Sequence, residues 1–192
     1  MATVWLTGLS GAGKTTLATA LADALASLDV AATVVDGDAV RAESGNYEYD
    51  PASRSLNVQR ICDAALSAAS AGRHAVVACI SPFAMDRELA RRRHIAFGVT
   101  FYEVHVNTPL AVCEARDPKG LYRSASEGKA RNVVGIDLDY EEPVHPDLRI
   151  DTSSVAVMDA MDLLTPLISG TSAAYANFAQ TDVVIDSHSH AR

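Results

Sequence analysis

Short apolar stretches rich in Val, Ile and Thr alternate along the chain with longer stretches in which apolar residues recur at helical spacing. The short runs are typical of buried strands, and the longer pattern is typical of amphipathic helices. We predict strands at residues 3–7, 33–36, 75–80, 101–106 and 148–150, and helices at residues 14–27, 56–71, 82–94, 108–115 and 154–167. This alternation predicts βαβ units, and therefore a three-layer α/β/α fold around a five-stranded, mostly parallel sheet.

Local signals support several of these helices. Leu17, Leu21 and Leu25 fall on one face of the first helix, as expected for a packing face. Thr108 stands where an N-cap is expected, with Pro109 in the first turn of the fourth helix.

Residues 117–146 break the alternation. They are polar, contain three glycines and three prolines, and carry both basic and acidic clusters. Such a stretch is typical of a surface excursion, so we predict a lid rather than a core element. We assign residues 1–170 to one domain and leave the role of the tail, residues 171–192, open. The two histidines near the chain end, His188 and His190, are more typical of a tail than of a metal site.

The composition fits one globular domain of 192 residues, 48% of them hydrophobic, with a net charge of −8. This acidity excludes a broad basic surface for nonspecific nucleic-acid binding, so an anionic ligand must be held locally. No apolar run approaches the roughly 18 residues that a membrane span needs. Cys62, Cys79 and Cys113 lie in apolar runs without metal-ligand spacing. We therefore expect a reduced cytoplasmic protein that binds neither membranes nor nucleic acid.

The strongest chemical signal follows the first predicted strand. Residues 8–15 read GLSGAGKT and match the G-x-x-x-x-G-K-[ST] pattern of a phosphate-binding loop between a strand and a helix. The loop points its backbone N–H groups inward, and the following helix presents its positive end. We predict that ATP is bound by Gly8, Ser10, Gly11, Ala12, Gly13, Lys14, Thr15 and Thr16. Lys14 should reach the β- and γ-phosphates, and the Thr15 hydroxyl should ligate Mg²⁺.

A second group of charges ends the second predicted strand, where Asp36-Gly37-Asp38 is followed by Arg41. Ligands of an open parallel sheet lie beyond the carboxyl ends of the strands, so these side chains should face the same crevice as the phosphate loop. A carboxylate there can accept a hydroxyl proton or orient Mg²⁺, and an arginine can hold a second anionic substrate. The alternative is an Asp-Gly turn with solvated charges.

Further blocks occur in a fixed order: DGDAVR at 36–41, RSLN at 54–57 followed by Arg60, ISPF at 80–83 leading to Asp86-Arg87, DPKGLY at 117–122 and GID at 135–137. Together with the phosphate loop they resemble the adenylyl-sulfate (APS) kinase family, which uses ATP to phosphorylate the ribose 3′-hydroxyl of APS and so makes PAPS. The resemblance covers about residues 4–152. It implies a P-loop kinase fold, a Mg·ATP requirement, a mobile lid and often a homodimer.

The resemblance also implies roles for single residues. Asp38 would lie nearest the acceptor hydroxyl, and Asp36 would support the magnesium region. Arg41, Arg54 and Asn57 would hold the phosphosulfate and sugar of the acceptor. Ile80 and Ser81 would line its pocket, and Lys119 in the lid would approach the phosphates.

The chain departs from the family pattern on the acceptor side. Where the family has a Phe against the acceptor's adenine, this chain offers only Tyr49 or Tyr47. The second aromatic of the family is replaced by Val133, which can still pack against the adenine but gives up stacking worth about 1–3 kcal/mol per base. Gln59 and Ser126 stand where arginines are usual.

Three functions therefore stay open. The first is an APS kinase; the second is the same chemistry on another small hydroxyl metabolite or nucleoside-derived intermediate, which the departures motivate. The third is a nucleotide-binding subunit without turnover, against which the retention of Lys14, Thr15, Asp36 and Asp38 argues. We expect the basic run at 87–93 to lie on a helix surface, with Arg87 reaching an acidic partner or the lid.

Overall fold

The computed structural model describes residues 1–45 and 47–170. The predictions for the tail, including His188 and His190, lie outside the described residues. Within the described part, no helix combines the length and apolarity needed to cross a membrane.

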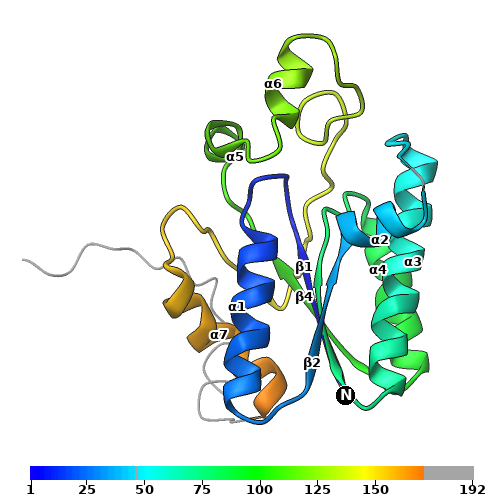
Figure 1. Ribbon diagram of the computed structural model, residues 1–192, viewed down its shortest axis with the longest axis vertical. Coiled ribbons are helices and arrows are strands. Elements are labelled where there is room, and N and C mark those ends of the chain that lie inside the picture. Colours follow the sequence, from blue (N-terminus) through cyan, green and yellow to red (C-terminus); the bar gives the residue numbers. More distant parts are fainter. Residues whose placement is uncertain (46, 171–192) are drawn as a thin grey trace, which may run out of the picture.

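Five parallel strands form the central sheet, in the order β2-β3-β1-β4-β5 (Figure 1). They are β1 (Ala2–Thr7), β2 (Ala32–Asp36), β3 (His74–Ala78), β4 (Thr100–His105) and β5 (Leu148–Arg149). The predicted fold class is confirmed, and the pairings of these five strands are all parallel. Because β1 lies at the centre of the sheet, the loop after it starts from the middle of the molecule.

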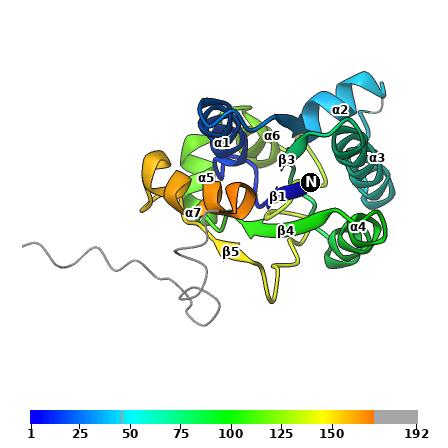
Figure 2. The same cartoon turned by 90° about the horizontal axis from the view of Figure 1, so that it is seen from below.

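Helices cover both faces of the sheet, as Figure 2 shows from below. The helices are α1 (Lys14–Ser27), α2 (Gly37–Glu43), α3 (Pro51–Ser70), α4 (Ala84–Ala96), α5 (Leu110–Arg116), α6 (Leu121–Ser126) and α7 (Val157–Ser169). α1 and α7 lie together on one face, and α3 and α4 lie together on the other. The predicted three-layer arrangement is therefore present.

The core consists of two buried clusters, one on each face of the sheet. Leu17 and Leu21 of α1 pack with Val4 of β1 in the first cluster, so the packing face predicted for this helix is confirmed. Trp5, whose side chain points to the other face of β1, packs with Ile61 of α3 in the second cluster. Each face of the sheet is thus sealed by helices, which leaves the carboxyl ends of the strands for ligands.

Several details of the helix prediction are wrong, two of them because an aspartate caps the helix. α3 begins at Pro51 rather than at 56, because the Asp50 carboxylate accepts hydrogen bonds from the Ala52 and Ser53 amides. α2 was absent from the prediction and begins directly after β2, capped in the same way by Asp36. Thr108 is not an N-cap, since its hydroxyl donates to the Ala12 carbonyl at 3.1 Å.

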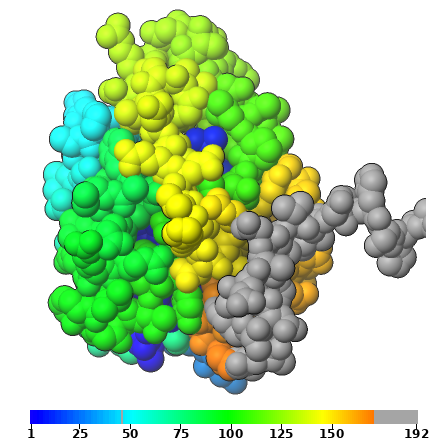
Figure 3. Space-filling model, turned by 180° about the vertical axis from the view of Figure 1, so that it is seen from behind, coloured from blue at the N-terminus to red at the C-terminus, as the bar shows by residue number. Residues whose placement is uncertain are grey.

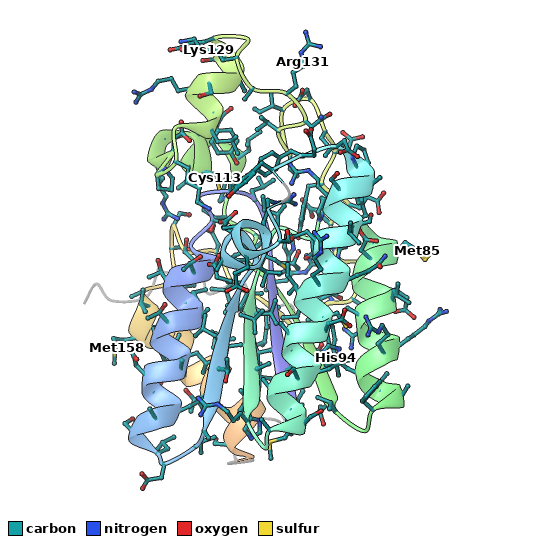
Figure 4. The ribbon with its side chains drawn as sticks, turned by 45° about the vertical axis from the view of Figure 1, so that its right-hand side comes forward. Met85, His94, Cys113, Lys129, Arg131 and Met158 are labelled. Atoms are coloured by element: carbon teal, nitrogen blue, oxygen red, sulfur yellow. The ribbon has the colours of Figure 1, made fainter. Side chains whose placement is uncertain are left out.

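The predicted lid projects from the sheet at the top of Figure 1 and carries the short helix α6. Its outer end is charged: Lys129 and Arg131 extend away from the body of the molecule in Figure 4. Its inner side, however, is part of the core, because Tyr122, Val133 and Val134 are buried. The segment is therefore an excursion with an apolar underside, whereas the prediction assigned no core residues to it.

Candidate active site

The phosphate loop after β1 needs glycine at two points of close approach. A Cβ atom on Gly8, whose φ is +150°, would lie 2.3 Å from the Val106 carbonyl oxygen, and one on Gly11, φ +76°, would lie 2.9 Å from the Cys113 carbonyl oxygen. Because only glycine fits both the space and the positive φ, the loop can curl tightly against the ends of the neighbouring segments. This leaves the start of α1 open toward the cavity.

Lys14 is the first residue of α1, and its side chain is 8% exposed. Its amine donates a hydrogen bond to the Leu9 carbonyl oxygen at 2.6 Å, so the side chain folds back over the loop. Burial lowers the pKa of Lys14 to about 8, because the charged form loses its hydration. A phosphate group beside the amine would restore the charged form.

Thr15 and Asp36 meet across the entrance of the cavity. The Thr15 hydroxyl donates to one carboxylate oxygen of Asp36 at 2.9 Å. The other oxygen accepts the Asp38 amide at 2.8 Å and the Ala39 amide at 3.3 Å, so the cap of α2 fixes the carboxylate. Two adjacent oxygen ligands suit Mg²⁺, which usually takes one or two protein ligands and completes its shell with phosphates and water. No cluster of three His, Cys, Asp or Glu side chains that could hold a metal occurs in the described part of the chain.

Asp38 lies one residue into the first turn of α2, and its carboxylate pairs with the Lys119 amine from the lid. Both side chains are more than half exposed, at 61% and 56%. The contact therefore joins a residue after β2 to one that follows α5, although 81 positions separate them. The predicted proton acceptor and the predicted lid cation are neighbours.

Two buried arginines and a tyrosine form the opposite side of the site. The guanidinium carbons of Arg41 and Arg54 lie 4.6 and 5.4 Å from the centre of the Tyr49 ring. Both arginines are 6% exposed. Burial, and secondly the neighbouring Arg41, lower the pKa of Arg54. Two cations held this close favour an anion between or beside them.

Asn57 and Ser81 add polar groups to this side. The Asn57 amide nitrogen donates to the Gly37 carbonyl at 3.1 Å, whereas its side-chain oxygen is buried without a hydrogen-bond partner. Ser81 follows β3 with a φ of +39°, and its hydroxyl accepts a hydrogen bond from the Trp5 indole at 3.0 Å. Both residues therefore belong to the polar part of the cavity wall.

These residues enclose one cavity of about 750 Å³ at the carboxyl ends of β1, β2 and β3. Its lining includes the predicted residues Ser10, Gly11, Gly13, Lys14, Thr15, Thr16, Asp36, Asp38, Arg41, Tyr49, Arg54, Asn57, Ile80, Ser81 and Lys119. The tyrosine is Tyr49 rather than Tyr47, which is 68% exposed and absent from the lining.

Three predicted site residues do not line the cavity. Gly8 and Ala12 belong to the phosphate loop, but Gly8 packs closely against Val106 and Ala12 is buried in the core. Val133 is 1% exposed and packs in the core under the lid, so the structure does not place it against an acceptor. The reason is the turn that carries it: the Asp137 carboxylate accepts the Asn132 and Val133 amides and folds the segment inward.

Arg116 and Thr152 line the cavity although the sequence did not single them out. Arg116 donates to the Gly11 carbonyl at 3.2 Å and to the Thr152 hydroxyl at 2.7 Å, and Thr152 donates to the Ala12 carbonyl at 2.8 Å. They brace the phosphate loop from α5 and from the segment after β5. The only sequence signal was the position of Arg116 directly before the DPKGLY block.

The phosphate loop follows the central strand of a parallel sheet. In one cavity it faces a pair of carboxylates and a second, cationic subsite. This arrangement defines a P-loop kinase, a phosphotransferase that binds ATP. The sequence model of the adenylylsulphate kinase family matches residues 1–151. The chain belongs to this family, which is the one that its motifs predicted.

Individual relatives agree with this assignment. The adenylyl-sulfate kinase of Pseudomonas aeruginosa is 47% identical over 155 residues, which cover 80% of this chain and 78% of the relative. The structure of the Mycobacterium tuberculosis APS kinase CysC in complex with AMPPNP and APS matches with a TM-score of 0.83 and 38% identity, over 86% of this chain and 96% of that one. A hexameric APS kinase from Thiobacillus denitrificans matches 86% of this chain and 28% of its own, with 34% identity and a TM-score of 0.62.

Proposed function

We propose that the chain transfers the γ-phosphoryl group of ATP to the 3′-hydroxyl of APS, giving PAPS and ADP. The observation that carries the proposal is the single cavity in which the phosphate loop faces Asp38 and the buried pair Arg41 and Arg54. Its two ends suit two anionic substrates, and membership of the adenylylsulphate kinase family supports APS as the second of them.

On the nucleotide side, the loop amides and Lys14 hold the phosphates and neutralise the charge that spreads over the transferred group. Thr15 and Asp36 would hold Mg²⁺, which supplies further charge neutralisation when bound. Arg116 and Thr152 keep the loop in its curled form through their hydrogen bonds to its carbonyls. Most of the catalytic effect in such a transfer comes from positioning and electrostatics.

On the acceptor side, Asp38 takes the proton of the attacking hydroxyl, and Arg41, Arg54 and Asn57 bind the phosphosulfate and sugar. Lys119 pairs with Asp38 in this structure. In our proposal it shifts toward the phosphates once both substrates are bound. Among the described residues that line the cavity, Tyr49 supplies the one aromatic ring. Val133 reaches the adenine only if the lid segment rearranges.

We extend the proposal to a cytoplasmic homodimer. The three cysteines are buried and unpaired, as expected in a reducing compartment. Met85 and Leu89, one turn apart on α4, are 75% and 42% exposed and offer an apolar contact. Light scattering on the purified protein, with and without Met85→Lys, measures the assembly.

The test of the activity is ADP release with Mg·ATP and a panel of acceptors, with APS first. The expected result is release that depends on APS. Asp38→Asn should lower kcat by about 10²-fold or more, the usual contribution of a positioned base, and spare most ATP binding. Lys14→Ala should instead weaken ATP binding. Turnover with a different hydroxyl compound but not with APS would establish the alternative acceptor, and a wild-type rate in Asp38→Asn would refute the role of that carboxylate.

A further inference from the structure

Arg87 on α4 is a buried arginine that contributes nothing directly to the cavity described above. The sequence pattern placed its segment on a helix surface, yet its side chain is 3% exposed. Its guanidinium donates to the Glu103 carboxylate at 2.7 Å, to the Ser81 carbonyl at 2.7 Å and to the Glu141 carbonyl at 2.6 Å. One side chain therefore joins β4, the turn after β3 and the end of the lid.

The turn after β3, which contains Ser81, belongs to the acceptor side of the cavity. Ser81 lines the cavity and has a φ of +39°, a conformation that a residue with a side chain adopts only when its surroundings hold it. The Arg87 hydrogen bond to the Ser81 carbonyl is one such restraint. The next residue, Pro82, cannot donate a backbone hydrogen bond of its own.

The third partner of Arg87, Glu141, lies where the lid returns to the body of the protein. The Glu141 amide donates to the Pro82 carbonyl at 2.9 Å, and the Glu141 carboxylate accepts the Ala84 amide at 2.6 Å, at the start of α4. The returning segment (yellow) runs across the face shown in Figure 3 and meets the surface of α4 (green). The lid end and the acceptor turn are thus bonded to each other as well as to Arg87.

Hydroxyl groups extend the connection to β1. The Thr7 hydroxyl has one proton, which it gives to the Ile80 carbonyl at 2.7 Å, because a carbonyl only accepts. Consequently the Ser81 and Tyr140 hydroxyls both donate to Thr7, at 2.9 and 2.8 Å. A second acceptor of the Thr7 proton, the Ser81 carbonyl, lies farther away at 3.5 Å, so the group favours the arrangement with the short bond to Ile80.

We propose that Arg87 is a positioning residue for the acceptor, which holds the Ser81 turn and the Tyr140–Glu141 end of the lid in one fixed relation. The inference rests on the proposed function, since it assigns the Ser81 side of the cavity to APS. A planar guanidinium donates in three directions at once, whereas a lysine amine at the same place reaches the two carbonyls and the carboxylate poorly. Arg87 acts through Ser81 and the lid and touches neither substrate.

Arg87→Lys tests this, and Arg91→Lys is the matched control. Arg91 lies one turn along α4 and shares Glu103 with Arg87, but its other partners are Phe101 and Asp147. Arg87→Lys should raise KM for APS about tenfold, the loss of roughly one charged hydrogen bond, and leave the Kd of a non-hydrolysable ATP analogue within about twofold. Arg91→Lys should change neither value by more than about twofold.

An equal loss of APS and ATP-analogue binding in Arg87→Lys, or the same APS effect in Arg91→Lys, would show a merely structural role and overturn the proposal. If Arg87→Lys does not fold, Tyr140→Phe decides, because it removes only the donor to Thr7. A selective rise in KM for APS in Tyr140→Phe supports the proposal, and an unchanged KM overturns it.

Amide hydrogen exchange separates this proposal from the proposed function. The Glu141 and Ala84 amides report the link between lid and turn, and both should exchange faster in Arg87→Lys but not in Arg91→Lys. If the wild type does not turn over APS, but both amides exchange faster in Arg87→Lys, the proposed function fails and the link through Arg87 stands. If they do not respond, the link itself is refuted.

Discussion

A rise in pH from 7 to 9 should weaken ATP binding because Lys14 loses its proton. The amine is buried, and burial lowers its pKa to about 8, against 10.5 for an ordinary lysine. Phosphate binding needs the charged amine. With this pKa the charged fraction of the free protein falls from about nine tenths at pH 7 to about one tenth at pH 9.

The expected magnitude follows from linkage. The bound state keeps the proton because phosphates surround the amine, so the apparent affinity falls in proportion to the charged fraction, about tenfold between pH 7 and pH 9. At pH 8, binding should take up about half a proton for each nucleotide. A lysine with an ordinary pKa would give almost no change over this range.

Calorimetry of a non-hydrolysable ATP analogue with Mg²⁺ measures the affinity and the proton uptake, if it is done in two buffers that differ in ionisation enthalpy. Lys14→Arg is the control, because an arginine stays charged throughout and leaves only the titration of the nucleotide. Equal wild-type affinities at pH 7 and pH 9 without proton uptake would refute the reasoning. So would the same pH dependence in Lys14→Arg.

Two further predictions concern stability. Burial and, secondly, Arg149 lower the pKa of His105 to about 4, so the unfolded chain takes up its proton near pH 6.5 while the folded protein does not. The free energy of unfolding should therefore fall by up to about 3 kcal/mol between pH 6.5 and pH 4. His105→Gln, which keeps an acceptor for Arg149, should remove this pH-dependent loss. If urea denaturation shows the same pH dependence in His105→Gln and in the wild type, the prediction is contradicted. Gly8→Ala should cost about 3 kcal/mol or more of unfolding free energy, because its Cβ would clash with Val106. Gly72→Ala, also at positive φ but with no atom within 4 Å of the added Cβ, should cost clearly less, and equal losses would show that conformation rather than the clash decides.

The phosphate loop is predictable from the sequence because its chemistry is local. Gly8, Gly11 and Lys14 lie within one loop and the helix turn that follows, so their spacing alone fixes their relation. The strand pattern likewise predicts a parallel sheet, since β1 and β3, in the middle of the sheet, are short and almost entirely buried runs. The boundaries at Asp36 and Asp50 were missed because single side-chain caps decide them.

The acceptor side depends on contacts between distant segments, and its prediction is correspondingly weaker. The choice of Tyr49 over Tyr47 follows from the approach of Arg41 and Arg54, which no spacing reveals. Val133 was predicted in the pocket from its position in a motif, but the turn closed by Asp137 directs it into the core. Arg87 was expected on a helix surface, because charged runs usually are, and to reach an acidic partner or the lid. Its bonds to Glu103 and Glu141 confirm these partners, whereas its burial was not predicted.

The way the site holds its cations explains how a chain with a net charge of −8 binds anions. Lys14, Arg41 and Arg54 are all buried, and each hydrogen-bonds to backbone carbonyl oxygens, of Leu9, of Glu48, and of Tyr49 and Asn132. None of the ion pairs among the described residues includes them. Carbonyls fix these side chains without neutralising them, so their charge stays available to a ligand. Arg87, by contrast, pairs with Glu103 and is thereby reserved for structure.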